Sequence, residues 1–227
     1  PGALVKNTTA FYRNTVVVCL VLAPVLMLVS SALQPPFVSS YVDRLADIDQ
    51  SGAAAWVSNV LFILTQVPML VAFLGIAHVL RRHSPRLASV AAVIGVLATF
   101  GEAVMGGTGL VYLTMAGDAE NRELFAGVWE QMESSPVMLF AMVGFGGTVL
   151  TLLLLSIGLF RSRLAPRWVP MLVCLYLILE FFGSNLTEYA SYAAVLCLLI
   201  GFGTLARLVW ESPREAGALP ARSELAV

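Results

Sequence analysis

The sequence predicts an all-α protein of the membrane: a bundle of six transmembrane helices with both termini in the cytoplasm. Of its 227 residues, 59% are hydrophobic and 12% are charged, and the mean hydropathy is +0.86. Soluble domains are about 45–50% apolar and about 25% charged. Six apolar segments are each long enough to cross a hydrocarbon core, which needs about 20 helical residues.

In chain order the predicted spans occupy residues 15–34, 56–80, 88–116, 137–160, 168–186 and 190–210. The first resembles a secretory signal peptide, because SSALQ at its end is similar to a small-residue cleavage site. Its apolar run from Thr15 to Leu33 exceeds the about 7–15 residues of a signal core, so it is predicted to be a span. Residues 1–210 are therefore one predicted transmembrane domain. Residues 211–227, rich in Pro, Ala and charge, are predicted to form a disordered cytoplasmic tail.

The orientation follows from the cations. Eleven of the 13 lysines and arginines fall on one side of the predicted membrane. They are Lys6, Arg13, Arg81, Arg82, Arg86, Arg161, Arg163, Arg167, Arg207, Arg214 and Arg222. Arg44 and Arg122 fall on the other side. Because cytoplasmic loops carry the excess of Lys and Arg, both termini are predicted to be cytoplasmic and the protein to lie in the plasma membrane.

The two long outer connections, residues 35–55 and 117–136, alternate apolar and acidic residues at helical spacing. Their apolar positions are Tyr41, Leu45 and Ile48 in the first, and Leu124, Phe125, Val128, Trp129 and Met132 in the second. This pattern predicts short amphipathic helices on the outer membrane surface or over the mouth of the bundle. Interfacial anchoring and a functional lid are both consistent with it.

Two carboxyl groups, Glu102 and Glu180, lie within apolar runs. A charge at bilayer depth costs about 2.5–3.5 kcal/mol even on the mildest scale, so each is a functional-site hypothesis. Counting from Ala88 and from Trp168 places both about 18–21 Å from the inner boundary. A carboxyl in an apolar, water-poor site can stay protonated near neutral pH, because desolvation disfavours the charged form, and can act as a general acid. Glu102 and Glu180 are the predicted catalytic residues.

Small residues on the face of Glu102, and Gly144 with Gly147 in the fourth span, predict close helix packing that turns Glu102 into the bundle. A polar stripe on the fifth span comprises Tyr176, Glu180, Ser184 and then Thr187 or Glu188. Aromatic faces can shield a cationic intermediate. The predicted substrate-binding residues are Asn59, Gln66, Phe100, Tyr112, Trp129, Tyr176 and Phe181. The alternative is that the amides and carboxyls are interhelical hydrogen-bonding groups that fix helix register.

The sequence shows no pattern typical of nucleic acid binding or of a metal site. The net charge is −1, which gives no indication of nucleic acid binding. Cys19, Cys174 and Cys197 lie in apolar runs without metal-ligand spacing, and His78 and His83 lack a partner at such spacing. No metal and no cofactor are predicted.

The segments VCLVLAPVLMLVSSAL, WVSNVLFILTQVPMLVAFLGIAHVLRRHSPRLA and GLFRSRLAPRWVP resemble small multi-pass membrane proteins of actinobacterial type, over nearly the full chain. Most of that group has no assigned function, so the resemblance implies no particular activity. In size, number of spans and acidic residues in a membrane pocket, the chain is also loosely similar to small integral-membrane terpene cyclases. That similarity implies acid-initiated cyclisation of a prenyl chain. The roles of Glu102 and Glu180 are inferred from the residues and are not carried over from that family.

The leading functional hypothesis is a membrane enzyme that acts on a lipophilic, isoprenoid-like small molecule through carboxyl acid–base chemistry. A proton-coupled transporter or lipophile-binding protein is the alternative, and a structural or regulatory membrane subunit is the third. The expected partners are a lipophilic small molecule and membrane lipid, and the oligomeric state is left open.

Overall fold

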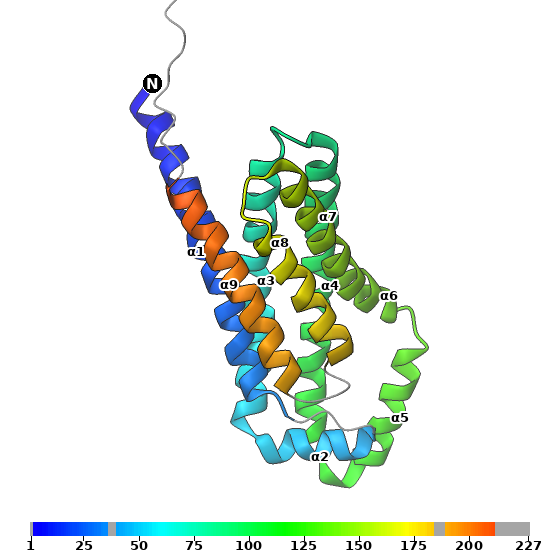
Figure 1. Ribbon diagram of the computed structural model, residues 1–227. Coiled ribbons are helices and arrows are strands. Elements are labelled where there is room, and N and C mark those ends of the chain that lie inside the picture. The colour runs from blue at the N-terminus through cyan, green and yellow to red at the C-terminus, as the bar shows by residue number, and fades with distance from the viewer. Residues whose placement is uncertain (1, 36–39, 184–188, 212–227) are drawn as a thin grey trace, which may run out of the picture.

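Long apolar helices account for most of the chain (Figure 1). The computed structural model describes residues 2–35, 40–183 and 189–211; within these ranges the chain is almost entirely helical and has no strand. Five described helices are long and apolar enough to cross a membrane, which confirms the all-α fold and indicates a multi-pass membrane protein. They are α1 (Gly2–Leu33, apolar from Ala10), α3 (Ala53–Leu80), α4 (Pro85–Ala116), the continuous helix Met138–Ser162 and α9 (Tyr189–Glu211).

The helix Met138–Ser162 changes its winding along its length. It begins as α6 (Met138–Ala141), continues as the π-helical turn η2 (Met142–Gly146) and ends as α7 (Gly147–Ser162). The next apolar helix ends in a second π-helical turn: α8 (Trp168–Ile178) leads into η3 (Leu179–Gly183).

The α8–η3 helix is shorter than the predicted span 168–186. Its 11 and five residues reach about 24 Å, against about 30 Å of hydrocarbon core. The sequence predicts six spans, whereas five described helices are long and apolar enough to cross a membrane. Residues 184–188, which include Ser184, Thr187 and Glu188 of the predicted polar stripe, lie outside the described residues. So do residues 212–227, nearly all of the predicted tail.

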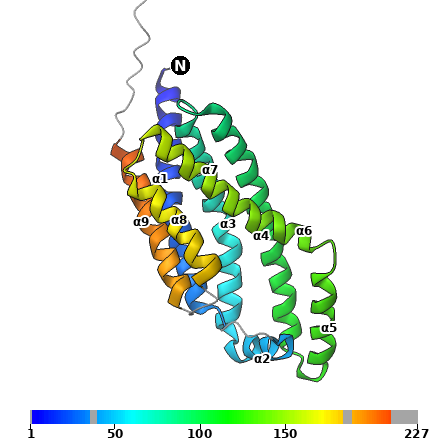
Figure 2. The same cartoon turned by 45° about the vertical axis from the view of Figure 1, so that its right-hand side comes forward.

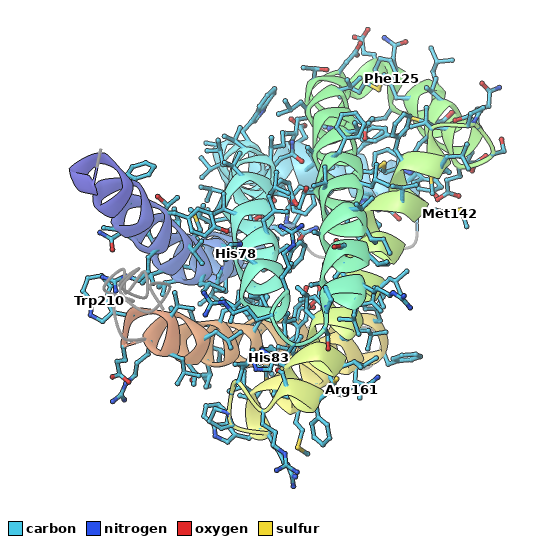
Figure 3. All side chains as sticks on the ribbon, turned by 90° about the horizontal axis from the view of Figure 1, so that it is seen from above. His78, His83, Phe125, Met142, Arg161 and Trp210 are labelled. Atoms are coloured by element: carbon cyan, nitrogen blue, oxygen red, sulfur yellow. The ribbon has the colours of Figure 1, made fainter. Side chains whose placement is uncertain are left out.

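The helices pack as an antiparallel bundle. α1 packs against α3 and α9, α4 against α3 and α7, and α8 against α7 and α9. The turns that carry Arg81, Arg82, Arg163 and Arg167 lie at the upper end in Figure 1, together with the described ends of α1 and α9. We call this the arginine end. Figure 3 looks onto it and labels His83, Arg161 and Trp210 there.

At the opposite end, which we call the cap end, two short helices join the long ones. α2 (Tyr41–Ser51) lies across this end in both Figure 1 and Figure 2, and α5 (Arg122–Glu133) leads from it toward α6. A 3₁₀ turn, η1 (Ala119–Asn121), precedes α5. Gly52, with a φ of 51°, ends α2 and starts α3 directly, a left-handed conformation that favours glycine. The helices predicted within 35–55 and 117–136 are confirmed.

The outer surface of the bundle is apolar. On α4, Val93, Leu97 and Phe100 are 62%, 52% and 58% exposed and lie on one helix face, whereas Ala98 and Glu102 are buried. The interior core includes the fully buried Phe73 and Phe202, with Leu20, Leu152 and Leu198. An apolar surface of this extent suits lipid rather than water.

Candidate functional site

Helix α4 and the turn η2 meet backbone to backbone. A Cβ atom on Gly101 would lie 2.6 Å from the Phe140 carbonyl oxygen and from the Gly144 nitrogen, and one on Gly144 would lie 2.8 Å from the Glu102 nitrogen. Only glycine permits this approach. The small residues of the two spans predict such close packing, since helices in lipid associate through contact of their backbones.

Beside this contact, Glu102 is buried, with 6% of its surface exposed. The Thr148 hydroxyl of α7 donates a hydrogen bond of 3.2 Å to Glu102 Oε1. Thr148 follows Gly144 by four residues, so both lie on the helix face turned toward α4. The glycine contact therefore brings a hydroxyl donor to the carboxyl.

Glu180 and Tyr176 lie on the neighbouring α8–η3 helix. Tyr176 is 4% exposed, and its hydroxyl lies 3.9 Å from Met27 Sδ of α1. Glu180 is half-buried. The carboxyls of Glu102 and Glu180 are near enough to interact electrostatically, and the Tyr176 hydroxyl interacts with both. The structure thus places Glu102 and Thr148 in contact, with Tyr176 and Glu180 of the α8–η3 helix within electrostatic range of Glu102. We call these four residues the carboxyl layer.

A π-helical turn borders each carboxyl. η2 contacts the backbone at Glu102, and η3 contains Glu180 itself. Such turns insert one residue into an α-helix and are frequently found at functional sites. Nothing in the hydropathy of the chain marks them.

The two amides predicted to bind substrate have backbone partners. Asn59 Nδ2 donates to the Gly106 carbonyl oxygen of α4 at 2.9 Å, and Gln66 Nε2 donates to the Phe62 carbonyl oxygen of its own helix at 3.2 Å. Asn59 thus joins α3 to α4. This is the interhelical hydrogen bonding that the sequence offered as the alternative to substrate binding.

Four predicted aromatic residues are exposed to the surroundings of the bundle or lie at its cap end. Phe100 is 58% exposed and packs edge-on against Phe140, with ring centroids 6.2 Å apart. Phe181 is 41% exposed. Tyr112 and Trp129 lie in ring contact with each other at the cap end. Of the aromatic residues predicted to line the site, Tyr176 is the one that the structure places with the carboxyls.

The rings at the cap end form a second group, the aromatic cap cluster of Tyr41, Arg44, Tyr112 and Trp129. The Trp129 ring lies 5.6 Å from the Tyr41 ring, and the Arg44 guanidinium lies 5.1 Å from its centroid. Burial lowers the pKa of Arg44. The Tyr112 hydroxyl lies 3.3 Å from the sulfur of Met132. The cluster joins α2 and α5 to the end of α4.

Two polar contacts reinforce the pairing of α2 with α5. Arg122, the first residue of α5, forms a 2.5 Å ion pair with Asp49 in the last turn of α2. The Tyr41 hydroxyl, at the start of α2, donates to Glu133 at the end of α5, and this hydrogen bond is the main cause that raises the pKa of Tyr41. The two helices are therefore held together at both ends.

Two surface grooves lie elsewhere. One of about 210 Å³ runs between α1 and α3, and one of about 200 Å³ lies between α7 and α8. The first is lined by Phe11, Tyr12, Thr15, Val71 and Leu74, and the second by Ser156, Ile157, Phe160, Arg161, Pro170 and Cys174. Neither lining includes a residue of the carboxyl layer. In the described part of the chain, no three His, Cys, Asp or Glu side chains gather as a metal site, and Cys19, Cys174 and Cys197 are free thiols.

Thr148 is the one residue of the carboxyl layer that is not among the residues predicted from the sequence. Its position four residues after Gly144, a residue predicted to pack closely, is the one signal that could have indicated it. Comparisons of this chain with protein-family models, with curated protein sequences and with solved structures found no match.

Proposed function

We propose that this protein is an integral membrane enzyme that converts a lipophilic, isoprenoid-like small molecule by general acid–base chemistry at Glu102 and Glu180. The observation that carries the proposal is the carboxyl layer: two carboxyls and a phenol gathered inside an apolar bundle. Groups so expensive to place at bilayer depth are typical of function rather than of packing.

The proposed reaction conserves protons. Glu102 transfers its proton to one carbon of a substrate double bond, and the π electrons of that bond form the new C–H bond. The other carbon becomes a cation, which the face of Tyr176 can stabilise. Internal attack by a second double bond closes a ring, and Glu180 then removes a proton from the neighbouring carbon to restore an alkene. The product is an isomer of the substrate.

The proposed membrane arrangement has six spans, with α8–η3 as the fifth and the arginine end in the cytoplasm. Two observations support it. The turns that carry arginine lie at one end of the bundle, and the N-terminal end of α1 and the C-terminal end of α9 lie at the same end. Arg44 and Arg122 at the cap end contact an aromatic ring and a carboxylate. We place the protein in the plasma membrane on the same grounds.

Cysteine labelling tests this arrangement. In a variant whose native cysteines are replaced by alanine, Ser51→Cys and Glu120→Cys should react with an impermeant thiol reagent added to whole cells. Ser84→Cys and Ser162→Cys should react only after the cells are opened. The reverse pattern would refute the proposed orientation.

A proton-coupled transporter of a lipophilic compound is the second candidate. The carboxyl layer suits it as well, because carboxyls inside a membrane bundle also form the proton relays of pumps and transporters. Detergent solution has no compartments, so the two functions separate there. New products from short linear prenyl alcohols or diphosphates, detected by mass spectrometry, would support the enzyme. Proton-linked uptake of unchanged compound into liposomes would refute it.

The carboxyl itself is tested by Glu102→Gln, which keeps the size and hydrogen bonding of the side chain and removes the transferable proton. Activity should fall about 10²–10⁴-fold while thermal stability is retained. Glu102→Asp withdraws the proton by about one methylene and should keep partial activity. Full turnover by Glu102→Gln would exclude Glu102 as the acid. If the carboxyl were only structural, Glu102→Gln would be silent and Glu102→Leu would lower thermal stability.

A further inference from the structure

The hydroxyl of Thr148 is bonded differently from those of six other threonines in the described helices. Six threonines donate to a carbonyl oxygen three or four residues earlier in their own helix, as threonine commonly does in apolar helices. They are Thr15, Thr65, Thr99, Thr108, Thr114 and Thr204. Thr148 donates instead to Glu102 on another helix. A hydroxyl turned away from its own backbone points to a role at its partner.

The backbone explains how Thr148 reaches Glu102. The hydrogen bond lies one helical turn from the place where Gly144 touches the Glu102 nitrogen. With no side chain between the two helices there, a short hydroxyl spans the distance. A wider helix separation, of the kind that larger side chains enforce, would leave Thr148 out of range.

The direction of the bond distinguishes the two oxygens of Glu102. A neutral carboxylic acid has one oxygen that donates and one carbonyl oxygen that accepts. The Thr148 hydroxyl lies 3.2 Å from Oε1. When this hydroxyl is the donor, Oε1 is the accepting oxygen of the neutral acid and the proton lies on Oε2. We propose that Thr148 is a positioning residue that fixes the transferable proton of Glu102 on Oε2.

This inference rests on the proposed function in one respect, namely that Glu102 gives its proton to a substrate. The placement of the proton is a property of the resting protein and can be measured without substrate. Thr148 itself touches no reacting atom in this scheme; it acts through Glu102.

Infrared spectroscopy of the purified protein tests the inference. The difference between wild-type and Glu102→Gln spectra isolates the C=O stretch of Glu102. In a Thr148→Val background the band should move to higher frequency, because the carbonyl oxygen loses its donor. Thr148→Ser keeps a hydroxyl and should return the band close to its wild-type position, and Thr148→Ala, a second donor-free variant, should shift it as Thr148→Val does.

Thr65→Val is the matched control. Thr65 is 3% exposed and bonds to the Leu61 carbonyl of its own helix, so its loss should leave the Glu102 band unmoved. A band that stays in place in both donor-free variants, or one that moves equally in Thr65→Val, would overturn the inference. So would the absence of a Glu102 C=O band in the wild type. A band shift combined with full turnover by Glu102→Gln would instead refute the proposed function and leave the positioning intact.

Discussion

Replacing Gly144 with alanine should separate α4 from η2. The added Cβ would lie 2.8 Å from the Glu102 nitrogen and 3.0 Å from the Gly101 carbonyl carbon. Carbon contacts are comfortable at about 3.5–4.0 Å, so the helices must move apart by about 0.7–1 Å. The Thr148–Glu102 hydrogen bond, now 3.2 Å long, would then approach about 4 Å and cease to be one.

The expected cost combines three effects. Overpacking costs about 1–3 kcal/mol. The lost interhelical hydrogen bond adds about 0.6 kcal/mol to the destabilisation. The better helix propensity of alanine offsets about 0.5–1 kcal/mol of it. The net destabilisation is about 2 kcal/mol, which corresponds to a fall of about 4–8 °C in Tm for a chain of this size.

Gly146 provides a matched control in the same π-helical turn. A Cβ on Gly146 meets nothing within 4 Å, so Gly146→Ala should be neutral or stabilising by up to about 1 kcal/mol. Both variants are compared by thermal unfolding in one detergent. A Gly144→Ala protein as stable as the wild type, or a Gly146→Ala protein equally destabilised, would refute the backbone contact.

Three further outcomes are expected. Asn59→Leu removes the hydrogen bond to α4 and should cost about 0.6 kcal/mol and at most about 1.7 kcal/mol, measured by unfolding in detergent; a larger loss would imply another partner for the amide. A double-mutant cycle on Asp49 and Arg122 should give a coupling of about 0.2–1 kcal/mol that weakens with salt, since Asp49 is half-exposed. The hydrogen bond to Glu133 raises the pKa of Tyr41 in the folded protein. The stability that this bond contributes is complete below about pH 10, and it is lost as the pH rises through the pKa of Tyr41 in the folded protein. Tm measured from about pH 9 to 11 should therefore fall more in the wild type than in Tyr41→Phe, and equal slopes would contradict this.

Hydropathy and charge predicted the helices well because lipid constrains them strongly. A spanning helix must be apolar over about 20 residues, and the segments that begin near residues 56, 88, 137 and 190 meet this requirement in the structure. The amphipathic spacing around Tyr41 and Trp129 likewise predicted α2 and α5.

Which residues make up the site was harder to predict, because the position of a residue along a helix does not say toward which side its side chain points. Phe100 precedes Glu102 by two residues, about 200° around the helix, and so lies on the lipid face. Tyr112 follows Glu102 by ten residues and lies at the cap end. The π-helical turns change the hydrogen-bonding register without changing residue polarity, so the spacing of Gly144 and Thr148 is the one sequence signal that Thr148 reaches Glu102.

The ring pair of Tyr112 and Trp129 also fixes a depth. Aromatic residues of this kind settle at the level of the lipid headgroups. If Tyr112 marks that level, Glu102 lies about 15 Å below it, since ten residues of α4 separate the two. In the proposed reaction Glu180 would take up one proton for each that Glu102 gives up. An isomerisation at this depth would therefore need no net exchange of protons with bulk water, unlike a hydrolysis.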